Sequence, residues 1–224
     1  MVTRWVTRHR VALWGKVVDG LTQTPLAGAE VTITTRPSEF GRRLELLAAA
    51  DREKWNRGEE RPDKTRSRAD GLFYFLDLPD GEYGLSAVLP NCGQRYAAAK
   101  HVAKVSWAAL DECDRRNAAG EKMQRMWVKL ALQPTTVRGK VIDADRNTAI
   151  MLAEVRMKAS GERTFSDIEG SFLLSPVQPA TNRRILQAFA QGYEPVEEEV
   201  AITAVGRSYD KDLKLKRRPA ERFP

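Results

Sequence analysis

Val11-Ala-Leu-Trp-Gly15-Lys-Val-Val-Asp19 is repeated 124 residues later as Thr136-Val-Arg-Gly139-Lys-Val-Ile-Asp143. The same spacing places Ala29-Glu-Val31 on Ala153-Glu-Val155 without a gap. Two matches in one register indicate an internal repeat. A repeat constrains the fold class more strongly than any single predicted strand or helix. The chain is therefore predicted to hold two copies of one domain.

Two further blocks repeat at shorter spacings, which reveals insertions in the first copy. Thr65 to Phe73 matches Thr164 to Phe172 at a spacing of 99 residues, and Val128-Lys-Leu130 matches Leu213-Lys-Leu215 at a spacing of 85. The first copy therefore has 25 and then 14 extra residues. Strong helix formers dominate both insertions, so each is predicted to add a helix, one of them over about 39–56. The insertions span about 38–64 and 104–124.

The repeated segments have the pattern of β-strands. Val11, Leu13 and Val17 alternate with more polar positions at a period of two, as a strand with one buried face requires. Asp70-Gly71 is a tight-turn pair, and Leu72-Phe-Tyr-Phe-Leu76 follows it as a further strand. Short strands with turn signals every 8 to 12 residues are typical of a sandwich or small barrel.

Several turn motifs of the first copy carry a family resemblance. They are Pro25-Leu-Ala-Gly-Ala29, Asp70-Gly71, Asp77-Leu-Pro79 and Gly81-Glu-Tyr83. With the Gly15-Lys-Val-Val-Asp19 strand, this pattern resembles the carboxypeptidase regulatory-like domain. The resemblance implies an all-β chain of two tandem seven-stranded prealbumin-like β-sandwiches, the first with two helical insertions. The expected domains are residues 10–134 and residues 135–219, and the second matches the family pattern less fully.

Charge and hydropathy limit the classes of partner. The net charge is +7, of which residues 135–224 contribute only +2, from 15 Lys and Arg against 13 Asp and Glu. The excess forms no Arg/Gly-rich or aromatic-basic run, so nucleic acid is not an expected partner. No stretch has the length and apolarity of a transmembrane segment, and residues 1–15 lack the apolar core of a secretion signal. A cytoplasmic location is therefore expected.

No residue pattern indicates a reaction. The chain has only two histidines, His9 and His101, with no metal-ligand spacing, and Cys92 and Cys113 form no CxxC pair. Gly-x-Ser-x-Gly is absent from the sequence. We expect no enzyme, no catalytic residue, no metal, no cofactor and no small-molecule substrate.

Three tryptophans outside the repeated segments are the candidate contact residues: Trp5, Trp55 and Trp107. They either attach the inserted helices to the sandwich or anchor a partner protein. Domains of the resembled family generally serve as spacers, adhesion units or docking modules. We expect a non-catalytic structural or adaptor protein that docks with other subunits of a larger assembly, such as a phage-tail-like contractile injection particle assembled in the cytoplasm. The alternative is a glycan- or cell-surface-binding module acting outside the cell, with Trp55 or Trp107 as its aromatic platform.

Overall fold

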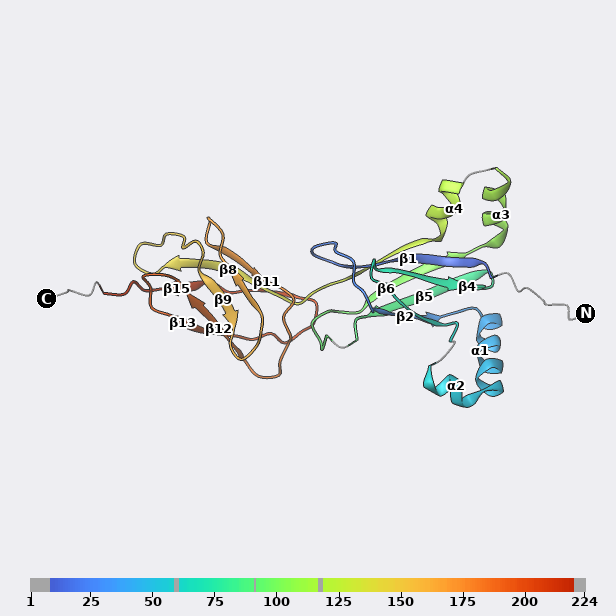
Figure 1. Cartoon of the computed structure of the whole chain (residues 1–224), viewed down its shortest axis with the longest axis horizontal. Helices are drawn as coiled ribbons and strands as arrows, with labels where there is room; N and C mark the ends of the chain where they lie inside the picture. Colours follow the sequence, from blue (N-terminus) through green and yellow to red (C-terminus); the bar gives the residue numbers. More distant parts are fainter. Residues whose placement is uncertain (1–8, 59–60, 91, 117–118, 220–224) are drawn as a thin grey trace, which may run out of the picture. The chain divides into compact units, whose positions relative to one another are not determined.

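The computed structural model describes residues 9–58, 61–90, 92–116 and 119–219. The chain divides into two compact units, residues 1–91 with 98–132 and residues 92–97 with 133–224. Each unit is a β-sandwich of two sheets (Figure 1). The fold class expected from the sequence is confirmed. The assignment of residues 10–134 and 135–219 to two copies of one family domain remains a prediction.

The first unit has seven strands in two sheets, with strand orders β4-β1-β7 and β3-β2-β5-β6. Strand β1 is the centre of the first sheet, antiparallel to β4 and parallel to β7. Its inward residues Leu13 and Val17 are buried, as are Phe73 of β4 and Leu130 of β7. The strands are β1 (Val11–Asp19), β2 (Glu30–Thr35), β3 (Lys64–Arg66), β4 (Leu72–Leu76), β5 (Gly81–Val88), β6 (Ala99–Val105) and β7 (Trp127–Leu132).

The second unit repeats this arrangement, with sheets β11-β8-β14 and β10-β9-β12-β13. Both β14 and β15 pair with β8 in parallel, and they do so in one register, with Asp210 opposite Arg138 and Leu213 opposite Val141. Together they take the place of β7. The strands are β8 (Thr136–Asp143), β9 (Glu154–Met157), β10 (Arg163–Phe165), β11 (Ser171–Leu174), β12 (Arg184–Phe189), β13 (Val196–Val200), β14 (Ser208–Asp210) and β15 (Leu213–Leu215).

The repeated glycine has the same physical reason in both units. A Cβ at Gly15 would overlap the backbone carbonyl oxygen of Val128 on β7, and a Cβ at Gly139 would overlap that of Lys211 beside β14. Any side chain would push the neighbouring parallel strand away, so only glycine allows this close approach.

The repeated serine closes the same loop in both units. The Ser67 hydroxyl donates to the Leu26 carbonyl at 2.7 Å and accepts from the Ala29 amide at 2.9 Å. Ser166 makes the same two bonds, to the Ile150 carbonyl at 2.7 Å and from the Ala153 amide at 2.9 Å. Each serine satisfies backbone groups that the turn between two strands would otherwise leave buried and unpaired.

Both insertions are helical, but each forms two helices where one was expected. The first gives α1 (Ser38–Ala50) and α2 (Arg52–Arg57), separated at Asp51, whose φ of −144° is not helical. The Asp51 side chain accepts from the Lys54 amide and so starts α2 as its N-cap. The second insertion gives α3 (Trp107–Arg115) and α4 (Ala119–Met126), which begin only after β6 has continued to Val105.

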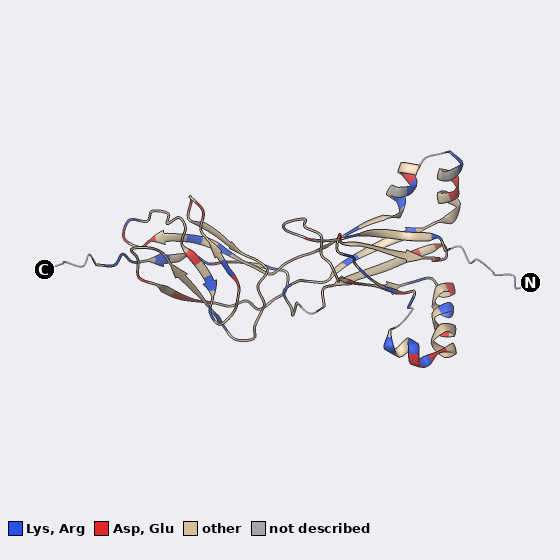
Figure 2. Cartoon of the chain, viewed as in Figure 1, with Lys and Arg blue, Asp and Glu red and all other residues tan. Residues whose placement is uncertain are grey.

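The α1–α2 hairpin and the α3–α4 hairpin lie on opposite sides of the first sandwich (Figure 1). Both hairpins carry acidic and basic residues (Figure 2). Helix α1 packs on the sandwich through buried Phe40 and Leu44. The Phe40 ring meets the Tyr83 ring edge-on, with centroids 5.8 Å apart. Helix α3 is attached through buried Leu110 and Cys113.

Candidate functional site

Three aromatic side chains form a row across the outer face of the β4-β1-β7 sheet. Trp14 on β1 is the register partner of Tyr74 on β4 and of Trp127 on β7. Trp14 packs edge-on against Trp127, with ring centroids 4.5 Å apart and ring planes at 73°. Tyr74 and Trp127 are exposed, and Trp14 is half-buried between them. The row therefore presents aromatic surface to solvent on the side of the sheet that faces away from the core.

Arg68 fixes one end of this row. Its guanidinium carbon lies 5.1 Å from the centre of the Tyr74 ring, and its Nη2 donates to the Tyr74 hydroxyl oxygen at 3.2 Å. Arg68 belongs to the tight turn before β4, where its amide is bonded to the Leu72 carbonyl. The turn thus holds a cation over the aromatic face, a contact worth about 0.5–1 kcal/mol at an exposed site.

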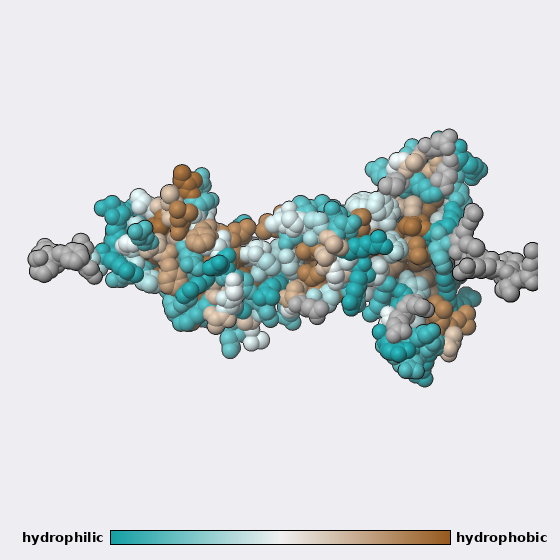
Figure 3. Space-filling model, viewed as in Figure 1, coloured by the Kyte–Doolittle hydropathy of each residue, from teal (hydrophilic) through white to brown (hydrophobic). Residues whose placement is uncertain are grey.

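A groove of about 520 Å³ lies between this sheet face and helix α4. Its floor is apolar, formed by Trp14, Leu72 and Tyr74, and Met126 of α4 closes one side. Figure 3 shows hydrophobic atoms between the α3–α4 hairpin and the body of the first unit. Isolated apolar side chains on a surface need no explanation, but a concave apolar site with few polar groups is typical of a binding site.

The border of the groove is positively charged. Arg68 and Lys122 line it, and Lys16 and Lys129 occupy the next row of the same sheet face, directly opposite each other. Like charges in register destabilise a sheet by a few tenths of a kcal/mol. Among the residues described, neither Lys16 nor Lys129 has an ion-pair partner. The surface therefore favours an apolar ligand with negative charge around it.

The tryptophans chosen from the sequence lie elsewhere. Trp5 falls outside the described residues. Trp55 on α2 is stacked under the Arg61 guanidinium at 4.1 Å, and Trp107 begins α3 with its indole N–H donating to the Leu78 carbonyl at 2.8 Å. Trp55 and Trp107 are on different hairpins, and the structure does not bring them together (Figure 1). The Trp107 indole thus joins the start of α3 to the loop between β4 and β5.

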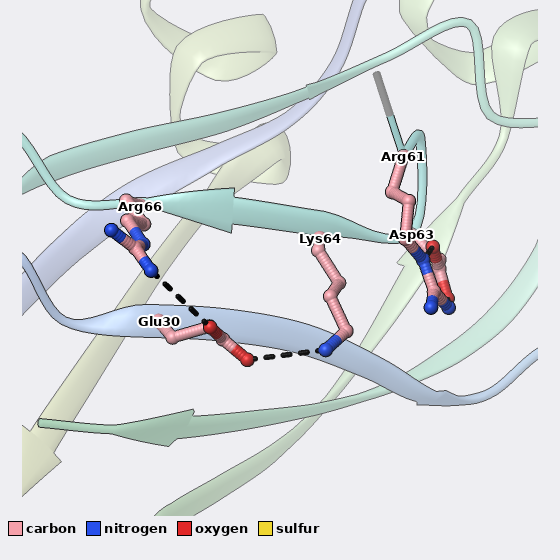
Figure 4. Close-up of polar contacts among 5 residues, drawn as sticks. All are labelled: Glu30, Arg61, Asp63, Lys64 and Arg66. Carbon is pink, nitrogen blue, oxygen red and sulfur yellow. Dashed lines mark hydrogen bonds and ion pairs between the residues drawn. The ribbon is translucent and has the colours of Figure 1, made fainter. Parts of the chain in front are cut away.

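Arg61, which stacks on Trp55, belongs to a charged cluster that serves the fold (Figure 4). Arg61 holds the buried carboxylate of Asp63 through two hydrogen bonds, of 2.9 and 2.6 Å. Lys64 and Arg66 of β3 approach Glu30 of β2 at 3.3 and 4.0 Å. The basic residues here are matched by carboxylates of the same unit, and they hold β3 to β2.

The Trp14 row was missed because its members are distant in sequence. Alternation along β1 placed Trp14 on the face opposite the core, but Tyr74 and Trp127 join it only through strand register. The described residues contain no group of three His, Cys, Asp or Glu side chains arranged to hold a metal. Within the same residues, no helix has the length and apolarity to span a membrane.

No model of a known protein family matches the chain, and no curated protein matches it. Solved structures do. The shaft pilin SpaA from Lactobacillus rhamnosus GG matches with 12% identity over 98% of this chain and 100% of its own, at a TM-score of 0.43. A streptococcal ancillary pilin matches with 16% identity over 92% of this chain and 62% of its own, at a TM-score of 0.34. The Bacillus anthracis TIE protein matches with 13% identity over 92% of this chain and 34% of its own, at a TM-score of 0.31.

These findings correct one expectation and leave another without support. The expected cytoplasmic location is contradicted, because the matched chains include a shaft pilin and an ancillary pilin. None of these matched proteins is described as part of a contractile injection particle. The likeness to the matched structures is therefore one of fold.

Proposed function

We propose that this chain is a non-catalytic structural module that acts outside the cell and docks another protein subunit through the groove on its first unit. The observation that carries this proposal is the groove itself, where Trp14 and Tyr74 form an apolar floor beside α4. We also propose that the two units are copies of one carboxypeptidase regulatory-like domain, since Gly15 and Ser67 have structural equivalents in Gly139 and Ser166.

The composition of the groove supports a protein partner. Protein interfaces have an apolar centre and a polar rim, and Trp, Tyr and Arg are the residues that most often dominate their binding energy. Here Trp14 and Tyr74 supply the centre, and Arg68 and Lys122 supply the rim. Arg68 is held in place by Tyr74, so less side-chain freedom is lost when a partner binds.

Carbohydrate binding is the second candidate, and the aromatic row favours it. Tyr74, Trp14 and Trp127 extend across three neighbouring strands, which are about 4.8 Å apart. Such a row offers aromatic surface to a sugar chain, with the Trp14 and Trp127 ring planes at 73° to each other. Trp127 belongs to the aromatic row but does not line the groove. Its substitution should therefore affect carbohydrate binding more than protein binding in the groove.

The test compares Tyr74→Ala, Trp127→Ala and the control Trp55→Ala in two assays. One is cross-linked capture from the cell-surface protein fraction, and the other is a polysaccharide array. The proposal expects a defined protein partner that Tyr74→Ala loses and Trp55→Ala keeps. Array binding that disappears in Trp127→Ala supports carbohydrate instead. Full partner binding by Tyr74→Ala contradicts the groove, and protection of the chain from protease added to intact cells contradicts an external location.

A further inference from the structure

The second unit carries an exposed apolar patch formed by Met151, Leu152, Phe165 and Ile168. Their exposed fractions are 57%, 68%, 56% and 82%. Met151 and Leu152 lie in the turn before β9, Phe165 ends β10, and Ile168 lies in the turn that follows β10. Ser166 joins these segments, since the Leu152 amide donates to the Ser166 carbonyl at 2.9 Å and the Ser166 hydroxyl donates to the Ile150 carbonyl. Figure 3 shows hydrophobic atoms protruding from the second unit near the turn before β11. These hydrogen bonds hold the turn before β9 beside the end of β10, so the four residues lie on neighbouring segments.

One residue of the patch, Leu152, has an unfavourable backbone conformation. Leu152 has a φ of +57°, in the left-handed region that favours glycine. The equivalent position of the first unit is Gly28, with a φ of +73°. A leucine at this position gains nothing from burial in its own unit, because its side chain is exposed. Strain of this kind is typical of functional surfaces.

The first unit lacks the patch. At the spacing of the repeat, Ala69 stands where the second unit has Ile168, and Arg66 stands where it has Phe165. The shared fold does not require apolar side chains at these positions. Their presence in the second unit alone points to a contact that only this unit makes.

The charges beside the patch are opposite to those beside the groove. Ile168 lies between Asp167 and Glu169 in an exposed turn, whose amides bond to the Asp167 carboxylate at 2.9 and 2.8 Å. Arg68 and Lys122 border the groove of the first unit. Ile168, an apolar residue with two acidic neighbours, is thus complementary in charge to the apolar groove and its two basic neighbours. Charge complementarity of this kind selects partners and orients them.

We propose that the patch of one copy docks in the groove of a second copy, with Ile168 over the Trp14–Tyr74 floor. This inference rests on the proposed docking role of the groove and names its occupant as a second copy of this chain. The two surfaces differ, so the contact is heterologous and leaves one free groove and one free patch in each dimer. Further copies can add to both.

The test measures mass by light scattering and sedimentation over a range of protein concentrations. Wild type is expected to associate as concentration rises, and Ile168→Asp and Tyr74→Ala are each expected to stay monomeric. A mixture of these two variants is expected to give a 1:1 complex, because one intact groove then meets one intact patch. The matched control is Leu46→Asp, an exposed leucine on α1 that should associate as wild type does. Added salt should weaken the wild-type association.

Four outcomes would overturn the inference. Wild type that is monomeric throughout excludes a second copy, and unchanged association of Ile168→Asp excludes the patch as the contact surface. A mixture of the two variants that forms no complex excludes this pairing of surfaces. A monomer whose tryptophan fluorescence changes in Ile168→Asp would show an internal contact instead, since all five tryptophans precede residue 128. None of these outcomes contradicts the proposed function if wild type binds a cell-surface protein that Tyr74→Ala does not bind. The proposed function is contradicted independently if Tyr74→Ala binds that protein as wild type does.

Discussion

Trp14 and Trp127 are 113 residues apart in sequence, yet their rings pack edge-on with centroids 4.5 Å apart. The parallel pairing of β1 with β7 places them opposite each other. Because the pair lies on the outer face of the sheet, its energy can be measured without disturbing the core between the two sheets. Its strength determines how firmly the floor of the groove is held before a partner binds.

A double-mutant cycle of Trp14→Ala and Trp127→Ala should give a coupling energy of about 0.5–1.5 kcal/mol, the usual contribution of an aromatic pair beyond burial. Urea unfolding followed by far-UV circular dichroism would measure it. Trp127→Phe should recover part of the loss because it keeps a ring. Additive single effects would show that the two rings do not support each other.

Gly15→Ala and Gly139→Ala should each destabilise the unit that contains them by about 3 kcal/mol, because the new Cβ overlaps a backbone carbonyl of the neighbouring strand. Tryptophan fluorescence reports on the first unit alone, since all five tryptophans precede residue 128. Only Gly15→Ala is expected to shift the fluorescence transition, while circular dichroism should detect both. Gly161→Ala is the control, as a Cβ there meets no atom within 4 Å. A fluorescence shift in Gly139→Ala would mean that the units do not unfold independently.

The sequence predicted those features that depend on local pattern or on comparison of the two copies. Period-two alternation located β1 and β8, and the spacing differences located both helical insertions. Asp51 divides the first insertion because its side chain caps α2, a local preference that the wider run of helix formers concealed. The aromatic row depends on register between strands far apart in the chain, which no local pattern encodes. The patch did leave a signal, since Ile168 replaces Ala69 and Leu152 replaces Gly28 between the copies.

Asp143 is a buried carboxylate whose charge the fold stabilises. Arg217 donates from Nε at 2.8 Å, and the amides of Arg146 and Asp145 donate at 3.0 Å. The Arg217 hydrogen bond is the main reason that the pKa of Asp143 lies well below its ordinary value of about 3.9. A lowered folded-state pKa contributes stability above the unfolded value, and this contribution is lost as pH falls through the folded value.

Wild type should therefore lose stability below about pH 4, and Asp143→Asn should be less stable at pH 7 but less sensitive to acid. Urea unfolding at several pH values, followed by circular dichroism, would show this as two curves that converge at low pH. The control is Asp210→Asn, which removes an exposed pair with Arg138 and should change stability by less than about 1 kcal/mol. Parallel pH curves for wild type and Asp143→Asn would show that Asp143 is not the titrating group.

Leu152 allows a test of whether stability has been given up for binding. Left-handed backbone costs a residue with a side chain about 1–2 kcal/mol, and glycine avoids this cost but loses more conformational freedom on folding. Leu152→Gly should therefore raise the free energy of unfolding of the second unit by about 0.5–1 kcal/mol while weakening self-association. Leu152→Ala keeps the strain and removes most of the apolar side chain, so it should weaken association without the gain in stability. If Leu152→Gly is more stable and associates as wild type does, the leucine has no role in the contact, and Met151, Phe165 and Ile168 must carry it.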